Sequence, residues 1–296
     1  MSFSTDAKKE LCQAKCDKKS LALAECYGAL LYAHSFSPRE IRFVTASGDL
    51  AQRLPRLFKR AFSLGFDSES AGGRQKLLIE DREKLRAVYA AFDLEAEATL
   101  SHHVNFGVLE EPGCMEAFVR GAFLAGGSVT DPAKRFHLEL ATPHAQVSRE
   151  MYVVLADLGF SPKEAARGGN SLLYFKRADA IADFLTALGA PVSAMAVMTA
   201  KVDKEMRNTV TRQINCDSAN ADKTVAAAQE QLEAIRRYVR AFGLDELPEP
   251  LRDTALLRIA NPAASLADLA QLSDPPVSKS CLSHRFRKIM GFAPKE

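Results

Sequence analysis

The first 190 residues contain two apolar runs that resemble each other and are compatible with helices. Residues 25–36 (ECYGALLYAHSF) are centred on Gly28, and residues 116–129 (EAFVRGAFLAGGSV) are centred on Gly121. After each run the pattern predicts a strand, a helix that ends at a Leu-Gly-Phe turn, a second strand and a closing helix. These segments are 41–47, a helix ending at Phe66, 76–80 and a helix from about Arg82, and then 135–142, a helix ending at Phe160, 171–177 and 178–188.

The repeated order predicts a tandem duplication of one α-β-β-α-β-α unit. The two central glycines are separated by nearly the same number of residues as the two Leu-Gly-Phe turns, which begin at Leu64 and Leu158. Two copies are too few for a solenoid, in which stacked repeats bury one another's apolar faces. We therefore expect repeats at 1–110 and 111–200. A chance similarity between two α+β halves is the alternative.

Strand patterns end near residue 200, and residues 201–246 are predicted to be a polar segment followed by a long linker helix. The helix is expected over 217–242, where apolar residues alternate spacings of three and four and so form an a/d seam. The seam consists of Val225, Ala228, Leu232, Ile235, Val239 and Phe242. Such a seam requires a partner, which is either a neighbouring domain of the same chain or a second copy.

Three short helices separated by strong breaks are predicted in the last domain, residues 247–296. Prolines precede the first and third helices, and a Ser-x-x-Asp capping box starts the second. The helices are expected over 251–260, with Leu251, Ala255, Leu256 and Ile259 on one side, over 266–272 after Ser265 and Asp268 of the capping box, and from Ser278 to about Met290. This order is typical of a helix-turn-helix DNA-binding domain.

The third of these helices has an apolar stripe and an opposite basic face. The stripe consists of Leu282, Phe286, Ile289 and Met290. A charged helix face is more often merely solvated, but this charge has one sign and is confined to one capped helix. Arginine and lysine reach guanine edges or phosphates, and serine hydrogen-bonds to either. We therefore predict DNA contacts by Lys279, Ser280, Ser283, His284, Arg285, Arg287 and Lys288.

Composition narrows the class of protein further. The formal net charge is only +2, so a nucleic-acid signal must be local. Cys12 and Cys16 are expected on one helix face, but no second Cys/His pair has a matching spacing, so we expect no metal and no cofactor. The longest uncharged stretch, 184–200, is slightly short for a bilayer, and Lys8 and Lys9 stand where a signal peptide is apolar. A cytoplasmic, nucleoid-associated protein without membrane contact is expected.

The two apolar runs resemble the LAGLIDADG motif of homing endonucleases, in which two helices pack backbone to backbone and each supplies a metal-binding carboxylate. Aligning Gly28 and Gly121 with the glycine of the motif places Ala33 and Gly126 at the positions of the acids. Neither side chain can bind a divalent cation, which requires anionic oxygen ligands. We therefore expect no catalytic residue and no enzymatic activity, and an active magnesium-dependent endonuclease is the disfavoured alternative.

Over essentially its whole length the chain resembles the WhiA family of sporulation and cell-division regulators. The resemblance is carried by MSFSTDAKKEL at the start and by segments 120–129, 207–235 and 261–289. One departure is Cys281, where family members usually have glycine. The resemblance implies a regulator of transcription that binds double-stranded DNA, acts in cell division and chromosome segregation, and in some lineages in sporulation. It implies an α+β fold with a duplicated LAGLIDADG-like domain, a linker helix and an all-α helix-turn-helix domain.

Two features leave alternatives open. The polar side chains of 207–223 are expected either to cap helices at a domain junction or to contact phosphates. The alternative to a DNA-binding regulator is a scaffold in cell division that binds DNA only weakly. In that case the N-terminal repeats or the linker helix would bind a protein partner.

Near the centre of the chain, His102 and His103 are expected at the surface before a strand over 104–109.

Overall fold

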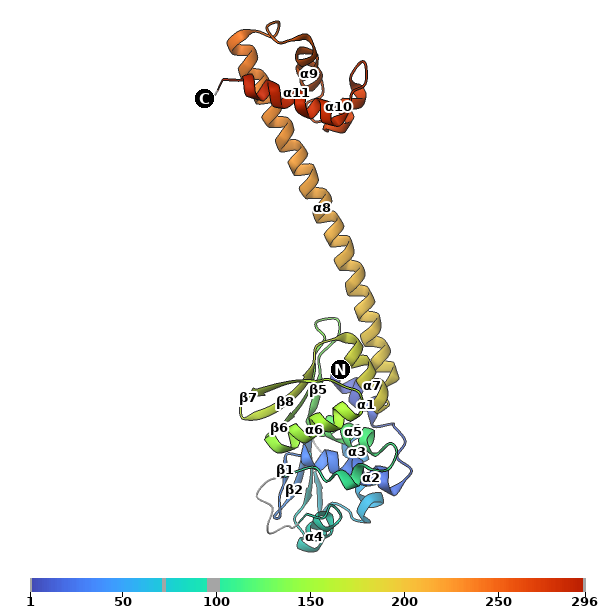
Figure 1. Cartoon of the computed structure of the whole chain (residues 1–296). Helices are drawn as coiled ribbons and strands as arrows, with labels where there is room; N and C mark the ends of the chain where they lie inside the picture. The colour runs from blue at the N-terminus through green and yellow to red at the C-terminus, as the bar shows by residue number, and fades with distance from the viewer. Residues whose placement is uncertain (1, 71–72, 95–101, 295–296) are drawn as a thin grey trace. The chain divides into compact units, whose positions relative to one another are not determined.

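The computed structural model describes residues 2–70, 73–94 and 102–294. The chain divides into two compact units, Met1–Lys204 and Glu205–Glu296. One long helix, α8 (Pro191–Phe242), contributes residues to both units (Figure 1). In the part of the chain that the structure describes, no helix is long and apolar enough to cross a membrane.

The first unit contains the predicted duplication, with more strands in each copy than the sequence predicts. A short helix, α1 (Phe3–Leu11), precedes the first copy. The first copy consists of α2 (Lys19–Leu31), β1 (Ser35–Phe36), β2 (Ile41–Thr45), α3 (Gly48–Phe62), β3 (Ser68–Ser70), β4 (Gln75–Ile79) and α4 (Arg82–Ala90). After a 3-10 turn at Phe106–Leu109, the second copy consists of α5 (Cys114–Gly126), β5 (Gly127–Val129), β6 (Leu138–Thr142), α6 (Ala145–Asp157), β7 (Lys163–Arg167), β8 (Asn170–Phe175) and α7 (Ala178–Leu188).

Each copy folds its four strands into an antiparallel sheet, in the orders β1-β2-β4-β3 and β5-β6-β8-β7. The predicted segments place no strand at β1 or β5, which lie within the apolar runs. They also miss β3 and β7, which pair with β4 and β8 at the edges of the sheets. Both strands are exposed along their length, and their sequences, SES and KEAAR, have no apolar alternation. In Figure 1 the strands of both sheets lie on the left of this unit, and helices α2, α3 and α5 lie on the right.

Helices α2 and α5 pack against each other with their backbones in close contact, as the glycines predict. A Cβ atom added to Gly28 would lie 1.9 Å from the carbonyl oxygen of Phe118. One added to Gly121 would lie 2.0 Å from the carbonyl oxygen of Glu25. No side chain fits at either position without moving the helices apart. Helix α2 ends at Leu31, so the apolar run that begins at Glu25 extends beyond the helix into β1.

The expected placement of Cys12 and Cys16 on one helix face is wrong. Helix α1 ends at Leu11, and Cys12 and Cys16 therefore do not share a helix face. The chain turns there because Arg53 donates hydrogen bonds to the carbonyl oxygens of Cys12, at 2.7 Å, and Ala14, at 2.9 Å.

The surroundings of His102 also differ from the expectation, and 104–109 is not a strand. The imidazole is half-buried and stacks on the ring of Phe36, with a centroid distance of 4.9 Å. Its Nε2 lies 2.7 Å from the carbonyl oxygen of Phe36. His103, in contrast, is exposed as predicted.

Helix α8 begins far earlier than the predicted residue 217. Its first residue is Pro191, whose fixed φ and missing N–H suit the first turn of a helix. The carboxylate of Glu10 accepts hydrogen bonds from the backbone N–H groups of Val192, at 2.7 Å, and Ser193, at 2.9 Å, and so caps this end. The polar residues 207–223 therefore lie in the middle of a helix and are exposed, and they cap no helix ends at a junction.

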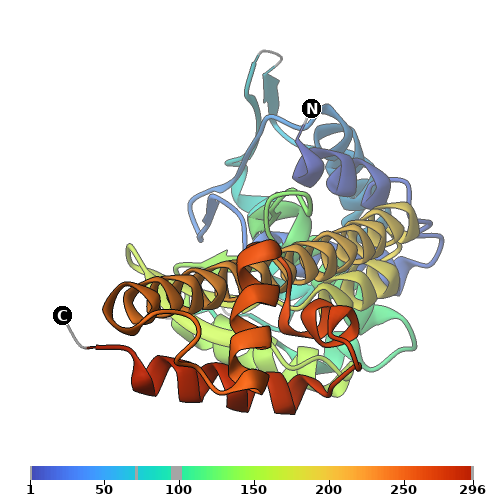
Figure 2. The same cartoon turned by 90° about the horizontal axis from the view of Figure 1, so that it is seen from above.

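In the second unit, three helices pack around the end of α8. They are α9 (Glu249–Ala260), α10 (Leu266–Leu272) and α11 (Lys279–Phe292), and Figure 2 shows α9 and α11, in orange and red, beside the end of α8. The predicted capping box of Ser265 and Asp268 is present. The predicted seam of α8 is partly satisfied within the chain, because Ala228 and Ile235 are buried.

The predicted apolar side of the first of these helices needs correction. Leu251 and Ala255 are buried, but Leu256 and Ile259 are 46% and 47% exposed. The buried face instead continues from Leu251 and Ala255 to Arg258, which is 1% exposed. An arginine at a core position offers no hydrophobic signal, so the sequence pattern shifted the stripe to the neighbouring apolar residues.

Candidate nucleic-acid interface

Helix α11 carries the side chains for which DNA contacts are predicted, and a cap fixes where it starts. Ser278 is the N-cap residue, and its hydroxyl accepts a hydrogen bond from the backbone N–H of Cys281 at 3.2 Å. Leu282, Phe286 and Ile289 are buried, as their spacing along one helix face predicts. The packed face fixes the rotation of the helix and leaves the opposite face open to solvent.

The open face of α11 brings together most of the predicted residues. Ser280, His284 and Arg287 lie at spacings of four and three residues, which places them in one row on the helix. The sequence of α11 contains no aspartate or glutamate, so no acidic side chain of this helix neutralises the row. Of the seven predicted residues, Lys279, Ser280, His284, Arg287 and Lys288 are exposed, and Ser283 and Arg285 are half-buried.

Arg285 lies at the border of this face and contacts α9. Its guanidinium donates a hydrogen bond to the hydroxyl of Thr254 at 3.4 Å. It also lines a cavity of about 290 Å³, together with Glu249, Asp253 and Asp274. These carboxylates offset part of the positive charge at this border of α11.

Arg258 on α9 contacts α11 from within the core of the second unit, and this role was not predicted. Its guanidinium donates hydrogen bonds to the side-chain oxygen of Gln231 at 3.1 Å and to the carbonyl oxygen of Ala264 at 2.6 Å. It also lies 5.3 Å from the centroid of the Phe286 ring, within the range of a cation–π contact. One buried cation thus joins α8, the α9–α10 turn and α11. Arg258 stands seven residues after Leu251 and so on the same side of α9, but this spacing alone does not predict burial of an arginine.

The positions aligned with the acids of the LAGLIDADG motif lie at the ends of the paired helices. Ala33 follows Tyr32, the C-cap of α2, and Gly126 is the last residue of α5. A Cβ atom at Gly126 would come within 2.7 Å of the ring of Tyr32, so an aromatic side chain occupies this end of the interface. Among the residues that the structure describes, no three His, Cys, Asp or Glu side chains are grouped to hold a metal ion.

A carboxylate does lie in this helix interface, but two arginines surround it. Glu25 on α2 is 1% exposed and accepts hydrogen bonds from Arg53 on α3 at 2.5 and 2.8 Å. It also accepts hydrogen bonds from Arg120 on α5 at 3.1 and 2.9 Å. Burial alone would lower the pKa of Arg53, but the hydrogen bonds and charge of Glu25 raise it above its ordinary value. We call these three side chains the Glu25 triad.

The Glu25 triad was not predicted, although the sequence carries a signal for it. Glu25 and Arg120 are charged residues inside the two apolar helical runs, and a charge in such a run is tolerated when it is paired. Arg53 could not be linked to them from the sequence, because its contact depends on how α3 packs on α2.

Comparisons with known proteins give consistent results for both units. The model of the WhiA LAGLIDADG-like domain matches residues 115–207, and that of the WhiA C-terminal HTH domain matches residues 210–293. A relative from Clostridium novyi, a probable cell division protein WhiA, is 32% identical over 98% of this chain and 96% of its own length. A relative of the same name from Ruminiclostridium cellulolyticum is 31% identical with the same coverage.

Solved structures show the same fold. Full-length DUF199/WhiA from Thermatoga maritima aligns over 100% of both chains with a TM-score of 0.60 and 23% identity. The N-terminal LAGLIDADG domain of DUF199/WhiA aligns over 64% of this chain and 92% of that one, with a TM-score of 0.50 and 22% identity.

Proposed function

This chain belongs to the WhiA family, and we propose that it is a sequence-specific, DNA-binding regulator of transcription without nuclease activity. The proposal places it in the cytoplasm at the nucleoid, acting in cell division and chromosome segregation, and in sporulation where the source organism sporulates. The name of its relatives, probable cell division protein WhiA, supports the cellular role.

The basic open face of α11 carries the proposal. A helix of this kind fits the major groove of B-DNA, where arginine side chains reach guanine and serine side chains reach several base edges. We assign base contacts to the central row, Ser280, Ser283, His284 and Arg287. Phosphate contacts are assigned to Lys279, Lys288 and Arg285 at its margins, where a positive charge acts regardless of sequence.

Fluorescence anisotropy tests this assignment. A duplex selected from genomic fragments by the full chain is titrated with wild type, Arg287→Ala and Arg240→Ala. The last is the matched control, because Arg240 is an exposed arginine on α8 to which no DNA contact is assigned. If Arg287 contacts a base, its loss should weaken binding by about 1–3 kcal/mol and reduce discrimination against unrelated DNA. An unchanged dissociation constant for Arg287→Ala would remove it from the interface.

A salt series separates the two kinds of contact. Loss of the phosphate-binding Lys288 should lower the slope of log affinity against log salt by about one and weaken all duplexes alike. If Lys288→Ala instead weakened only the selected duplex, its assignment to phosphate would be wrong.

One observation favours a second candidate, a scaffold that binds a protein partner through the linker helix. Val202, Met206, Val210 and Ile214 recur every four residues on α8, and each is more than half exposed. Such a row is suited to an apolar partner surface. A chain lacking residues 251–296 should then retain its cellular role, whereas loss of function on this deletion would favour the DNA-binding regulator.

A further inference from the structure

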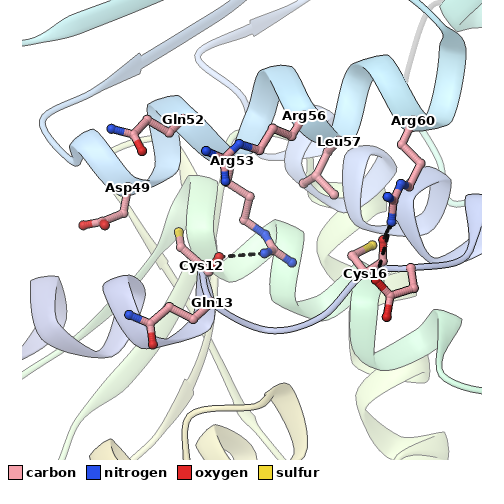
Figure 3. Close-up of a pocket in the computed structure, with 10 residues that line it drawn as sticks. Cys12, Gln13, Cys16, Asp49, Gln52, Arg53, Arg56, Leu57 and Arg60 are labelled. Carbon is pink, nitrogen blue, oxygen red and sulfur yellow. Dashed lines mark hydrogen bonds and ion pairs between the residues drawn. The ribbon is translucent and has the colours of Figure 1, made fainter.

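A cavity of about 320 Å³ opens in the first unit between helix α3 and the loop that follows α1 (Figure 3). Its wall on the side of α3 carries three arginines, Arg53, Arg56 and Arg60, at spacings of three and four residues. Figure 3 shows the side chains of Arg53 and Arg60 reaching from α3 toward the loop. Cavities of this volume lie at the lower end of the range for small-molecule sites.

Two of the three arginines are held in place by the protein. Arg53, which is 9% exposed, donates to the Glu25 carboxylate and to the carbonyl oxygens of Cys12 and Ala14. Arg60 donates to the carbonyl oxygen of Cys16. A bound ligand therefore finds these guanidinium groups already ordered, which reduces the entropy lost on binding.

Arg56 differs because its guanidinium makes no hydrogen bond or ion pair within the described part of the chain. It is exposed, lines the cavity, and stands between the two ordered arginines in the sequence of α3. Two acids also line the cavity. Asp17 lies 3.7 Å from Arg60 and so already faces a cation, and Asp49 lies in the first turn of α3. The unpaired donor is thus an arginine, whose planar fork fits phosphate in a bidentate manner.

The two thiols that line the cavity provide no alternative chemistry. Burial is the main cause that raises the pKa of Cys12 to about 12 and that of Cys16 to about 11. Both thiols are therefore protonated at neutral pH, whereas a thiolate is the form that attacks a disulfide or binds a metal.

We propose that this cavity binds the phosphate group of a small phosphorylated molecule, with Arg56 as the ligand-contacting arginine, Arg60 as an ordered donor and Arg53 as an ordered positive charge beside it. Arg53 also belongs to the Glu25 triad, which joins α2, α3 and α5. The proposed phosphate site thus adjoins the interface of the two glycine-containing helices. A signal carried by a phosphorylated metabolite would thus be sensed in the first unit.

Calorimetric titration and thermal unfolding of the full chain test the proposal, with inorganic phosphate, AMP and adenosine as probes. Phosphate and AMP should bind and raise the unfolding midpoint by mass action, and adenosine should do neither. Arg56→Gln should raise the dissociation constant for AMP about ten- to hundredfold, as expected for the loss of a charge-assisted contact. The matched control is Arg86→Gln, an exposed arginine on α4 outside the cavity, which should bind AMP like wild type.

Two outcomes would overturn the proposal. One is that phosphate and AMP give neither heat nor a shift of the midpoint. The other is equal AMP binding by wild type and Arg56→Gln. If this variant in addition weakened binding of duplex DNA, α3 would be a DNA-contacting helix. None of these outcomes affects the test of Arg287, which lies on α11 in the second unit, so the two proposals fail separately.

Discussion

Replacement of Glu25 by glutamine should destabilise the first unit strongly, because it removes the carboxylate that faces two buried arginines. The substitution keeps the size of the side chain and removes its charge. Breaking a buried ion pair from one side costs about 3–5 kcal/mol, since a charge is left in the interior without its counterion. Arg53 and Arg120 are each 9% exposed in their side chains, so water cannot take the place of Glu25.

Thermal unfolding of the full chain converts this cost into a shift of the midpoint. An unfolding entropy of about 2.1 cal/mol/K per residue corresponds to roughly 0.4 kcal/mol/K for a unit of residues 1–204. The midpoint of this unit should therefore fall by about 7–12 °C for Glu25→Gln. Hydrogen exchange of peptides from α2 and α5 assigns the transition to this unit, because their amides should lose protection first.

Glu164→Gln is the matched control, because this glutamate is exposed on the edge strand β7. Its effect should be within about 0.5 kcal/mol, as for other surface substitutions. If Glu25→Gln shifted the midpoint no more than Glu164→Gln, the two arginines would not depend on the carboxylate, and the account of the Glu25 triad would be refuted.

Three further predictions concern packing, the second unit and pH. Gly121→Ala forces a methyl group against the carbonyl oxygen of Glu25, so the free energy of unfolding should fall by about 3 kcal/mol in denaturant titrations. A Cβ atom at Gly65 would meet open space, so Gly65→Ala should lower the free energy of unfolding by less than about 1 kcal/mol. Arg258→Ala leaves the buried acceptors of this arginine unpaired. The free energy of unfolding of the second unit should therefore fall by about 2–4 kcal/mol. Burial lowers the pKa of His102, so the unfolded chain binds a proton at higher pH than the folded chain. Stability should decline as pH falls below about 6.5, and His102→Gln should reduce that slope.

The parts of the fold that could be predicted from the sequence are those in which local chemistry and packing agree. Gly28 and Gly121 stand in otherwise good helices, and only a close helix contact explains them. Ser265 and Ser278 mark helix starts through hydrogen bonds to backbone N–H groups within three residues. Such features need no knowledge of distant contacts, which is why their positions were predicted correctly.

The parts that could not be predicted depend on partners far away in the sequence. Helix α8 begins at Pro191, where Glu10, from near the N-terminus of the chain, caps it. Its middle section is rich in Asn, Thr and Asp, residues of modest helix propensity, so the local pattern did not indicate a helix there. Arg258 lies at a core position because three separate acceptors surround it, and a hydrophobicity pattern assigns a lone arginine to the surface.

The position of the buried carboxylate explains what the LAGLIDADG-like interface can and cannot do. A divalent cation needs carboxylate oxygens with free lone pairs at the helix ends, and Ala33 and Gly126 offer none. Glu25 lies earlier on α2, and both its oxygens already accept hydrogen bonds from guanidinium groups. A metal ion there would have to displace two arginines that would then be left buried and unpaired, at a cost of several kcal/mol. The interface is therefore suited to holding two repeats rigidly together, and a role in DNA recognition requires contacts outside it.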